Sequence, residues 1–277
     1  MRFFLGTNAV HWLSDPRSAE APLFVSRRRL SSYKTLPPAA GSFALDSGGF
    51  TELQMHGKWT ITAEQYAEEV GRFVRFYEEK LLWVAPQDWM CEPIVITGGN
   101  AGRGVVFRGT RSYVVEHQRR TVKNFVALRA LLGDLVIPVL QGWSLVDYRR
   151  CQELYAKAGV RLADEPTVGL GSVCRRQSTV EATEIVTALA ADGLRLHGFG
   201  FKKGGVKNCH KMLASADSMA WSATARQTPV LLPDHDKPGP GRCGGHKNCT
   251  SCAEWAFMWR EQLMREIETV EAAPAFC

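Results

Sequence analysis

The sequence predicts an α/β fold of the (β/α)8 TIM-type barrel class, with a small subdomain at its C-terminal end. Two observations support this prediction. Short apolar segments typical of buried strands alternate with amphipathic segments typical of helices along the 277 residues. Several strand-like segments also run directly into polar residues or glycine, and an α/β barrel carries its active site at these carboxyl ends. We place the barrel at residues 1–228 and the subdomain at 229–277.

The strand-like segments are short and begin at the N-terminus, where Met1–Gly6 is the first. Each later segment is followed by a polar residue or ends in glycine at its carboxyl end. Asp46 follows segment 42–45, Asp88 follows 81–86, Gln141 and Gly142 follow 135–140, and Gly171 and Ser172 follow 167–170. Segment 195–200 itself ends in glycine. These are six segments, and about seven strands can be counted along the whole chain, so one strand of the barrel remains unassigned.

Helix signals lie between the strands. Thr62 and Gln65 form a capping box that opens a helix reaching to about Lys80. A second amphipathic stretch ends at Gly133, a residue type that terminates helices. The predicted helices are 62–80, 114–132, 144–158, 178–193, a short one at 209–214, and 254–268 after the last loop.

An open doubly wound sheet is the alternative architecture. No Gly-x-Gly-x-x-Gly turn follows the first strand and no Walker-type loop occurs, so the usual nucleotide-binding signals of an open sheet are missing. Polar residues spread over five strand ends favour the barrel.

Composition narrows the class of partner. No run of 18 or more apolar residues occurs, so we expect no membrane span, and the N-terminus lacks the features of a signal peptide. We therefore expect a cytoplasmic protein. The net charge of +6 permits a polyanionic partner without requiring one. Basic clusters such as Arg27–Arg29 are typical of a solvated surface.

A glycine-rich stretch at 94–110 interrupts the alternation of strands and helices. It contains five glycines together with Arg103 and Arg108. A loop of this length inside a compact domain is often functional. A second loop, at 229–245, is rich in proline and glycine and leads to a cluster of cysteines.

That cluster predicts a metal site. Cys243, His246, Cys249 and Cys252 offer three thiolates and an imidazole within ten residues, a set suited to tetrahedral Zn²⁺. Four protein ligands close such a site, so the zinc would be structural. The identity of the histidine is open, because His235 or His210, or even Cys277, could replace His246.

Three acidic residues stand out, and two of them, Asp46 and Asp88, follow predicted strands. Asp46 precedes Ser47, Gly48 and Gly49, where it either forms a turn or approaches a ligand. Asp217 lies in a small, apolar segment, where an acid is either a hydrogen-bonded structural group or a catalytic carboxylate with a shifted pKa. Together with Asp88, these carboxylates suit glycosidic chemistry, in which one attacks the anomeric carbon and another transfers protons.

The order of these motifs resembles the tRNA-guanine transglycosylase superfamily over roughly residues 42–260. Its compact branch, the DNA-modifying transglycosylases of phages and bacterial modification islands, has a segment similar to Gln87–Pro93. The stretches that carry the resemblance are Asp46–Phe50, Asp88–Pro93, Leu140–Gly142, Gly171–Val173 and Asp217–Trp221, followed by the cysteine cluster.

The resemblance implies a zinc-containing (β/α)8 barrel that replaces guanine in a polynucleotide with a 7-deazaguanine such as preQ0. Asp217 would attack C1′ and hold a covalent glycosyl intermediate, while Asp46 would act as general acid and base. The base would be bound by Ser47, Gly48, Gly49, Phe50, Asp88, Gln141, Gly142, Gly171 and Ser172.

Departures from the superfamily pattern favour DNA over tRNA as the polymer. The chain is short and has no appended RNA-binding domain, Ser172 replaces a glycine, and the zinc ligands are respaced. Phosphate contacts are then expected from Arg103, Arg108, Lys202 and Lys203. Exchange on tRNA is the main alternative, followed by a DNA glycosylase and by a non-catalytic nucleic-acid-binding protein. The resemblance also allows a homodimer formed through the zinc region.

Overall fold

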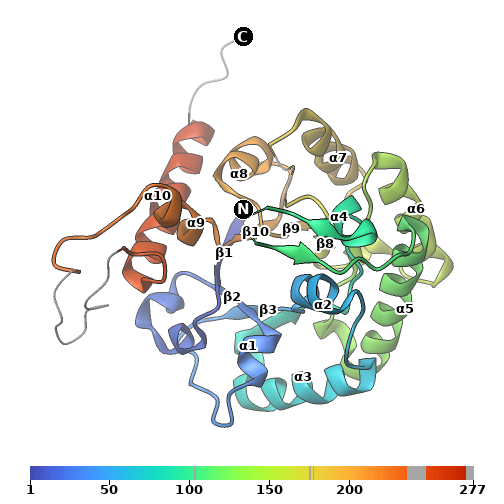
Figure 1. Ribbon diagram of the computed structural model, residues 1–277, viewed down its shortest axis with the longest axis horizontal. Helices are drawn as coiled ribbons and strands as arrows, with labels where there is room; N and C mark the ends of the chain where they lie inside the picture. The colour runs from blue at the N-terminus through green and yellow to red at the C-terminus, as the bar shows by residue number, and fades with distance from the viewer. Residues whose placement is uncertain (103, 175, 177, 236–247, 273–277) are drawn as a thin grey trace.

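Eight parallel strands curl into a barrel in the computed structural model, which describes all residues except 103, 175, 177, 236–247 and 273–277 (Figure 1). The strand order is β4-β3-β2-β1-β10-β9-β8-β7. A parallel bridge between Val84 and Val136 joins β4 to the segment that enters β7, so the two ends of the sheet meet. The strands are β1 (Arg2–Thr7), β2 (Leu23–Ser26), β3 (Phe43–Asp46), β4 (Leu81–Val84), β7 (Val139–Leu140), β8 (Val168–Leu170), β9 (Leu196–Gly198) and β10 (Ser215–Ser218). The predicted fold class is therefore confirmed.

Helices surround the barrel, and most of the predicted ones are confirmed (Figure 1). The capping box at Thr62 is present, and Ser144 forms a second one with Asp147. The helices are α1 (Arg27–Ser31), α2 (Gly49–His56), α3 (Ala63–Tyr77), α4 (Pro93–Thr97), α5 (Val114–Leu132), α6 (Leu145–Lys157), α7 (Val180–Ala191), α8 (Lys203–Cys209), α9 (Ala220–Gln227) and α10 (Ala253–Ala272). None of them, within the described residues, has the length and hydropathy needed to cross a membrane.

The prediction of a short helix at 209–214 is wrong. The chain forms α8 one turn and a half earlier, over Lys203–Cys209, and Cys209 is its last residue. The sequence gives little sign of this helix, because Gly204 and Gly205 lie in it and glycine ordinarily disfavours helix interiors. Packing stabilises the helix instead, because Gly205, Val206 and Cys209 are buried.

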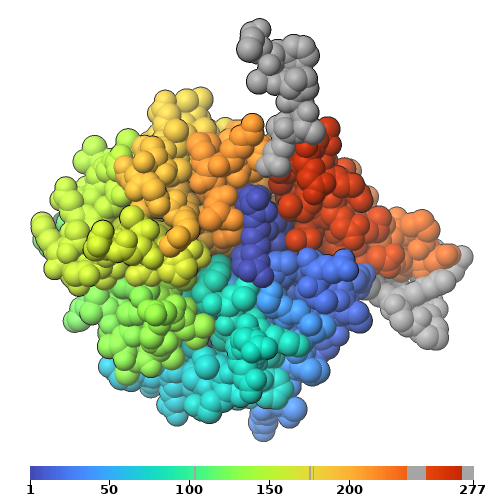
Figure 2. Space-filling model, turned by 180° about the vertical axis from the view of Figure 1, so that it is seen from behind, coloured from blue at the N-terminus to red at the C-terminus, as the bar shows by residue number. Residues whose placement is uncertain are grey.

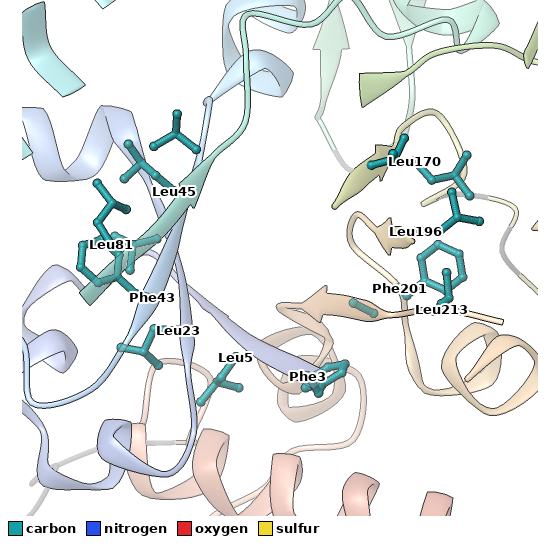
Figure 3. Close-up of a cluster of buried hydrophobic side chains, with 14 of the residues drawn as sticks. Phe3, Leu5, Leu23, Phe43, Leu45, Leu81, Leu170, Leu196, Phe201 and Leu213 are labelled. Atoms are coloured by element: carbon teal, nitrogen blue, oxygen red, sulfur yellow. The ribbon is translucent and has the colours of Figure 1, made fainter. Parts of the chain in front are cut away.

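Alternating side chains separate the barrel interior from the layer beneath the helices. Phe3 and Leu5 of β1 belong to a large cluster that includes helix residues, part of which Figure 3 shows. Phe4, between them, points into the barrel. The interior cluster takes one side chain from each of several neighbouring strand segments, namely Phe4, Phe24, Ala44, Trp83 and Ile137. These large side chains fill the barrel, so a ligand can be held only at its end.

Two segments extend the barrel. The glycine-rich stretch forms α4 and a two-stranded hairpin of β5 (Gly99–Asn100) and β6 (Val106–Phe107), inserted before α5. At the other end of the chain, α10 packs on β1, where Arg260 Nε donates to the Phe3 carbonyl and Trp259 contacts the Phe3 ring. From behind, the first residues of the chain lie between two segments from its last third, coloured orange and red (Figure 2). The boundary at residue 228 stays a prediction.

β2 is a strand that is not among the segments named from the sequence, and Arg27, directly after it, does not lie on a solvated surface. Arg27 is only 4 % exposed, forms an ion pair with Glu69, and donates through Nε to the Ser47 carbonyl at 3.0 Å. Its neighbour Arg28 pairs with the buried Glu52. The solvated-surface interpretation is therefore wrong for Arg27, because this side chain ties α1 to α3 and to the turn after β3.

Arg27→Met should lower the free energy of unfolding by about 3 kcal/mol, because breaking a buried ion pair leaves its partner charge without compensation. Urea unfolding of the purified variant measures the change. Arg29→Met is the matched control, since Arg29 is exposed. Equal stability of the Arg27 and Arg29 variants would contradict the structural role of Arg27.

Candidate active site and metal centre

A cavity of about 330 Å³ opens at the carboxyl end of the barrel. Every one of the eight strands contributes to it, either from its last residue or from the loop that follows. The predicted site residues that line the cavity are Asp46, Ser47, Gly49, Phe50, Asp88, Gln141, Gly171, Ser172 and Asp217. Because parallel strands bring their carboxyl ends to one rim, residues scattered over more than 170 sequence positions converge here.

Asp46 ends β3, and its carboxylate caps the turn that follows. Its Oδ2 accepts the Gly48 N–H at 3.1 Å. Gly48 has φ +80°, and a Cβ at this position would lie 2.7 Å from Arg28, so both backbone conformation and space require glycine. Burial raises the pKa of Asp46 to about 7, and the charges of Asp217 and Asp88 add to this rise. Asp46 can therefore accept or release a proton near neutral pH.

Asp88 lies in the loop after β4, within a hydrogen-bond network. Ser47 Oγ donates to its Oδ1 at 3.2 Å, and Gln141 Nε2 donates to its Oδ2. Burial raises the pKa of Asp88 to about 6, although both hydrogen bonds oppose the rise. The carboxylate of Asp88 and the amide of Gln141 thus form one polar edge of the cavity, an arrangement suited to a flat, hydrogen-bonding ligand.

The turn after β8 holds Gln141 in place. A Cβ on Gly171 would lie 2.2 Å from Gln141 Nε2, so only glycine allows this approach. Ser172 does more than replace a glycine: its Oγ accepts the Cys91 N–H at 2.7 Å and lies 2.6 Å from Gln141 Oε1. The hydroxyl therefore connects the loop after β4 with the side chain at the end of β7.

Asp217 is the acid that β10 brings to the cavity. It is 5 % exposed, and its Oδ1 accepts the Gly200 N–H at 2.9 Å. Phe50 and Met219 line the same cavity and are 41 % and 37 % exposed. Two carboxylates, Asp46 and Asp217, therefore share one cavity with the polar edge formed by Asp88 and Gln141.

Other predicted residues lie outside the cavity lining. Gly48 and Gly142 shape the loops beneath it, where a Cβ on Gly142 would meet Asp147 and Tyr148. Arg108 is exposed, and Arg103 lies outside the described residues. Lys203 forms an ion pair with Glu266 and so connects α8 with α10, while Lys202 precedes α8. The phosphate contacts of these four basic residues stay predictions.

A candidate metal centre lies where the chain enters α10. His235, Cys249 and Cys252 are buried, and their ligand atoms lie within 4.8 Å of one another. His235 Nδ1 is 3.5 Å from each sulfur, the separation expected when zinc binds nitrogen at about 2.0 Å and sulfur at about 2.3 Å in a tetrahedral site. His235 Nε2 lies 3.0 Å from a Glu254 carboxylate oxygen, which suits a carboxylate that orients a metal-binding histidine.

The cluster favours one of the histidines proposed as the zinc ligand. His235 joins Cys249 and Cys252, whereas His210 Nδ1 lies 2.9 Å from the Lys207 carbonyl within its own helical segment. The predicted ligands Cys243 and His246, together with the alternative Cys277, lie outside the described residues. The donor set of the cluster fits zinc, and Cys243 and His246 stay predictions for the remaining position.

His235→Ala should reduce bound zinc from about one ion per chain toward zero and lower the unfolding temperature, because structural zinc contributes directly to folding free energy. Metal analysis and thermal unfolding measure the two effects. His11→Ala is a control at an exposed histidine. In parallel, zinc analysis of Cys243→Ser and His246→Ala identifies the fourth ligand. Full zinc content in His235→Ala would contradict its assignment.

Sequence reasoning missed two buried residues that contact the site. Arg27 was hidden in a run of arginines, and its contact with the Ser47 carbonyl supports the turn that carries Gly48. His197 is fully buried in β9, with Nε2 3.3 Å from Asp217 Oδ1. The only signal for His197 was a polar residue inside a buried strand.

Comparison with known proteins identifies the family. A search of curated proteins returns no match. The family model described as DpdA, DeoxyPurine in DNA protein A, matches residues 1–275, which is nearly the whole chain. The match agrees with the motif order, with the barrel and with the carboxylates at its carboxyl end. This chain therefore belongs to the DpdA family, the DNA 7-deazaguanine transglycosylases.

Proposed function

We propose that this protein removes guanine from DNA and inserts a 7-deazaguanine of the preQ0 type at the same C1′ atom, through a covalent glycosyl intermediate on Asp217. The observation that carries the proposal is the shared cavity, in which Asp46 and Asp217 lie with the polar edge of Asp88 and Gln141. Membership of the DpdA family supports DNA as the polymer.

In the first half of the exchange, a carboxylate oxygen of Asp217 attacks C1′ while the bond from C1′ to the guanine nitrogen breaks. Protonated Asp46 supplies the proton that the departing base needs. In the second half, the same carboxylate of Asp46 takes the ring proton of the entering base, whose nitrogen then attacks C1′ and displaces Asp217. A pKa near 7 suits Asp46 to both directions of proton transfer.

Recognition of the base is assigned to Asp88 and Gln141. Asp88 would accept hydrogen bonds from the ring N–H and the exocyclic amine of a guanine-like base, and Gln141 would meet its carbonyl. Ser47 and Ser172 hold these two side chains through direct contacts. Phe50 and Met219, both partly exposed at the cavity, offer apolar surface for the flat face of the base.

Access to C1′ in a duplex requires the guanine to leave the base stack. Arg108 and Lys202 are the described basic residues that we propose for contact with phosphates, with Arg103 as a further candidate. Lys203 can take this role only by exchanging its ion pair with Glu266. A homodimer and a cytoplasmic location stay predictions, and the zinc that His235, Cys249 and Cys252 would hold serves to stabilise α10.

Incorporation of radiolabelled preQ0 tests the proposal, with duplex DNA and unmodified tRNA offered separately to the same enzyme. We expect label in DNA alone. Label in tRNA alone would keep the chemistry and change the polymer. Abasic sites formed in DNA without added base would indicate a glycosylase, and DNA binding without label or abasic sites would indicate a non-catalytic protein.

A further inference from the structure

His197 occupies an unusual place for a polar residue, at the centre of the aromatic interior of the barrel. Its side chain has no exposed surface. Four aromatic rings surround it with centroid separations between 4.7 and 5.8 Å: Trp83, Phe199, Phe24 and Phe4. A phenylalanine would satisfy this environment equally well, so packing alone does not explain a histidine here.

The hydrogen-bonding atoms of the ring explain the residue better. His197 faces Ser215 across the parallel pair of β9 and β10, and its Nδ1 lies 2.9 Å from Ser215 Oγ. Its Nε2 lies 3.3 Å from Asp217 Oδ1 but is not aligned as a hydrogen bond, and this nitrogen forms no hydrogen bond with any described residue. If the Ser215 hydroxyl donates to Nδ1, the single proton of a neutral imidazole must be on Nε2. That N–H then faces Asp217.

Gly200 and His197 both approach the same carboxylate oxygen of Asp217. The Gly200 N–H donates to Oδ1, and His197 Nε2 approaches that oxygen as well. Among the described residues, one hydrogen bond reaches the Asp217 carboxylate, from the Gly200 N–H to Oδ1, and none reaches Oδ2. The carboxylate is therefore fixed through one oxygen, and the other oxygen is left for the cavity that Asp217 lines.

We propose that His197 is a positioning residue, which with Gly200 orients the Asp217 carboxylate so that Oδ2 attacks C1′. The inference rests on the proposed function. When the glycosyl ester at Oδ2 breaks in the second half of the exchange, negative charge returns to the carboxylate, and an N–H at Oδ1 stabilises it. Loss of this N–H should therefore slow the chemical steps and leave binding of the base unchanged.

Three substitutions separate this role from packing. His197→Phe keeps an aromatic ring among the four surrounding rings and removes both nitrogens. His197→Gln keeps an N–H donor on a flexible side chain of similar reach. Ser215→Ala removes the hydroxyl that selects the tautomer of His197. Thermal unfolding shows which variants are folded, and kcat and KM for labelled preQ0 on duplex DNA are measured for each.

We expect His197→Phe to lower kcat by about 100-fold, as for removal of one preorganised donor, with KM for the base within about twofold of wild type. His197→Gln should recover a large part of this loss. Ser215→Ala should lower kcat in the wild-type background and have no further effect in the His197→Phe background, because its contribution passes through the imidazole.

The outcomes distinguish the inference from the proposed function. A folded His197→Phe protein with wild-type kcat would overturn the inference alone. If that variant does not fold, Ser215→Ala with unchanged kcat would overturn it equally. A wild-type protein that incorporates no label into DNA would overturn the proposed function, and the inference with it.

Discussion

Asp217→Asn should reduce incorporation of 7-deazaguanine into DNA by at least about 10⁴-fold, the scale seen when a covalent nucleophile is removed. The amide has nearly the shape of the carboxylate, and its oxygen could still accept the Gly200 N–H that now reaches Oδ1. It lacks the negative charge that forms the ester with C1′. The fold should be retained because the shape of the side chain is kept. A modest loss of stability is expected, because the side chain is only 5 % exposed and one of its oxygens becomes an NH₂.

Two measurements check this result. Incorporation of labelled preQ0 gives the rate, and a denaturing gel reveals whether protein remains covalently attached to labelled DNA when no second base is supplied. The adduct should form with wild type and be absent with Asp217→Asn. Asp134→Asn is the matched control, since Asp134 lies in the turn before β7 and is highly exposed. Incorporation by Asp217→Asn at a rate near wild type would refute the covalent mechanism.

The cavity could be predicted because its residues follow strands. Asp46, Gln141 and Gly171 each come directly after a buried apolar segment, and the carboxyl ends of parallel strands meet at one rim. Sequence order alone therefore grouped residues that are far apart in the chain. The strand β2 was missed because it runs into arginines rather than glycine or an acid.

Contacts made by buried polar side chains could not be predicted in the same way. Arg27 looks like part of a surface run, and its burial follows from Glu69 of α3, which is 42 positions away. His235 lies 14 residues before Cys249, and the fold rather than local spacing brings it to the sulfurs. Motif reasoning selected His246 because it lies between the cysteines in sequence. Such partners depend on tertiary geometry, which local patterns do not contain.

The cavity concentrates acidic groups at a cost to stability. Asp46 and Asp88 both have raised pKa values, chiefly because burial disfavours their charged forms, and the charge of Asp217 raises that of Asp46 further. A protein selected only for stability would replace one of these acids with a neutral residue. Keeping them is the expected result of selection for proton transfer, and it makes the pH dependence of stability a test of the site that requires no substrate.

Asp46→Asn should lower incorporation by about 10²–10⁴-fold, the usual contribution of a general acid or base, and yet stabilise the protein at alkaline pH. The pKa of Asp46 rises from 3.8 to about 7 on folding, so the folded state binds this proton more tightly than the unfolded state. The resulting stability is present below pH 3.8 and is lost as the pH rises to about 7. Asparagine stays neutral and avoids that loss.

The advantage of Asp46→Asn over wild type should therefore grow by roughly 1–2 kcal/mol between pH 5 and pH 8, a figure reduced for the partial exposure of the side chain. Urea unfolding of both proteins at the two pH values measures it. Asp134→Asn should show no such growth because its carboxylate is exposed. A stability difference that is the same at pH 5 and pH 8 would mean that Asp46 is already ionised at pH 5. Asp46 could not then supply the proton that the departing guanine needs near neutral pH, and the acid would have to be sought elsewhere in the cavity.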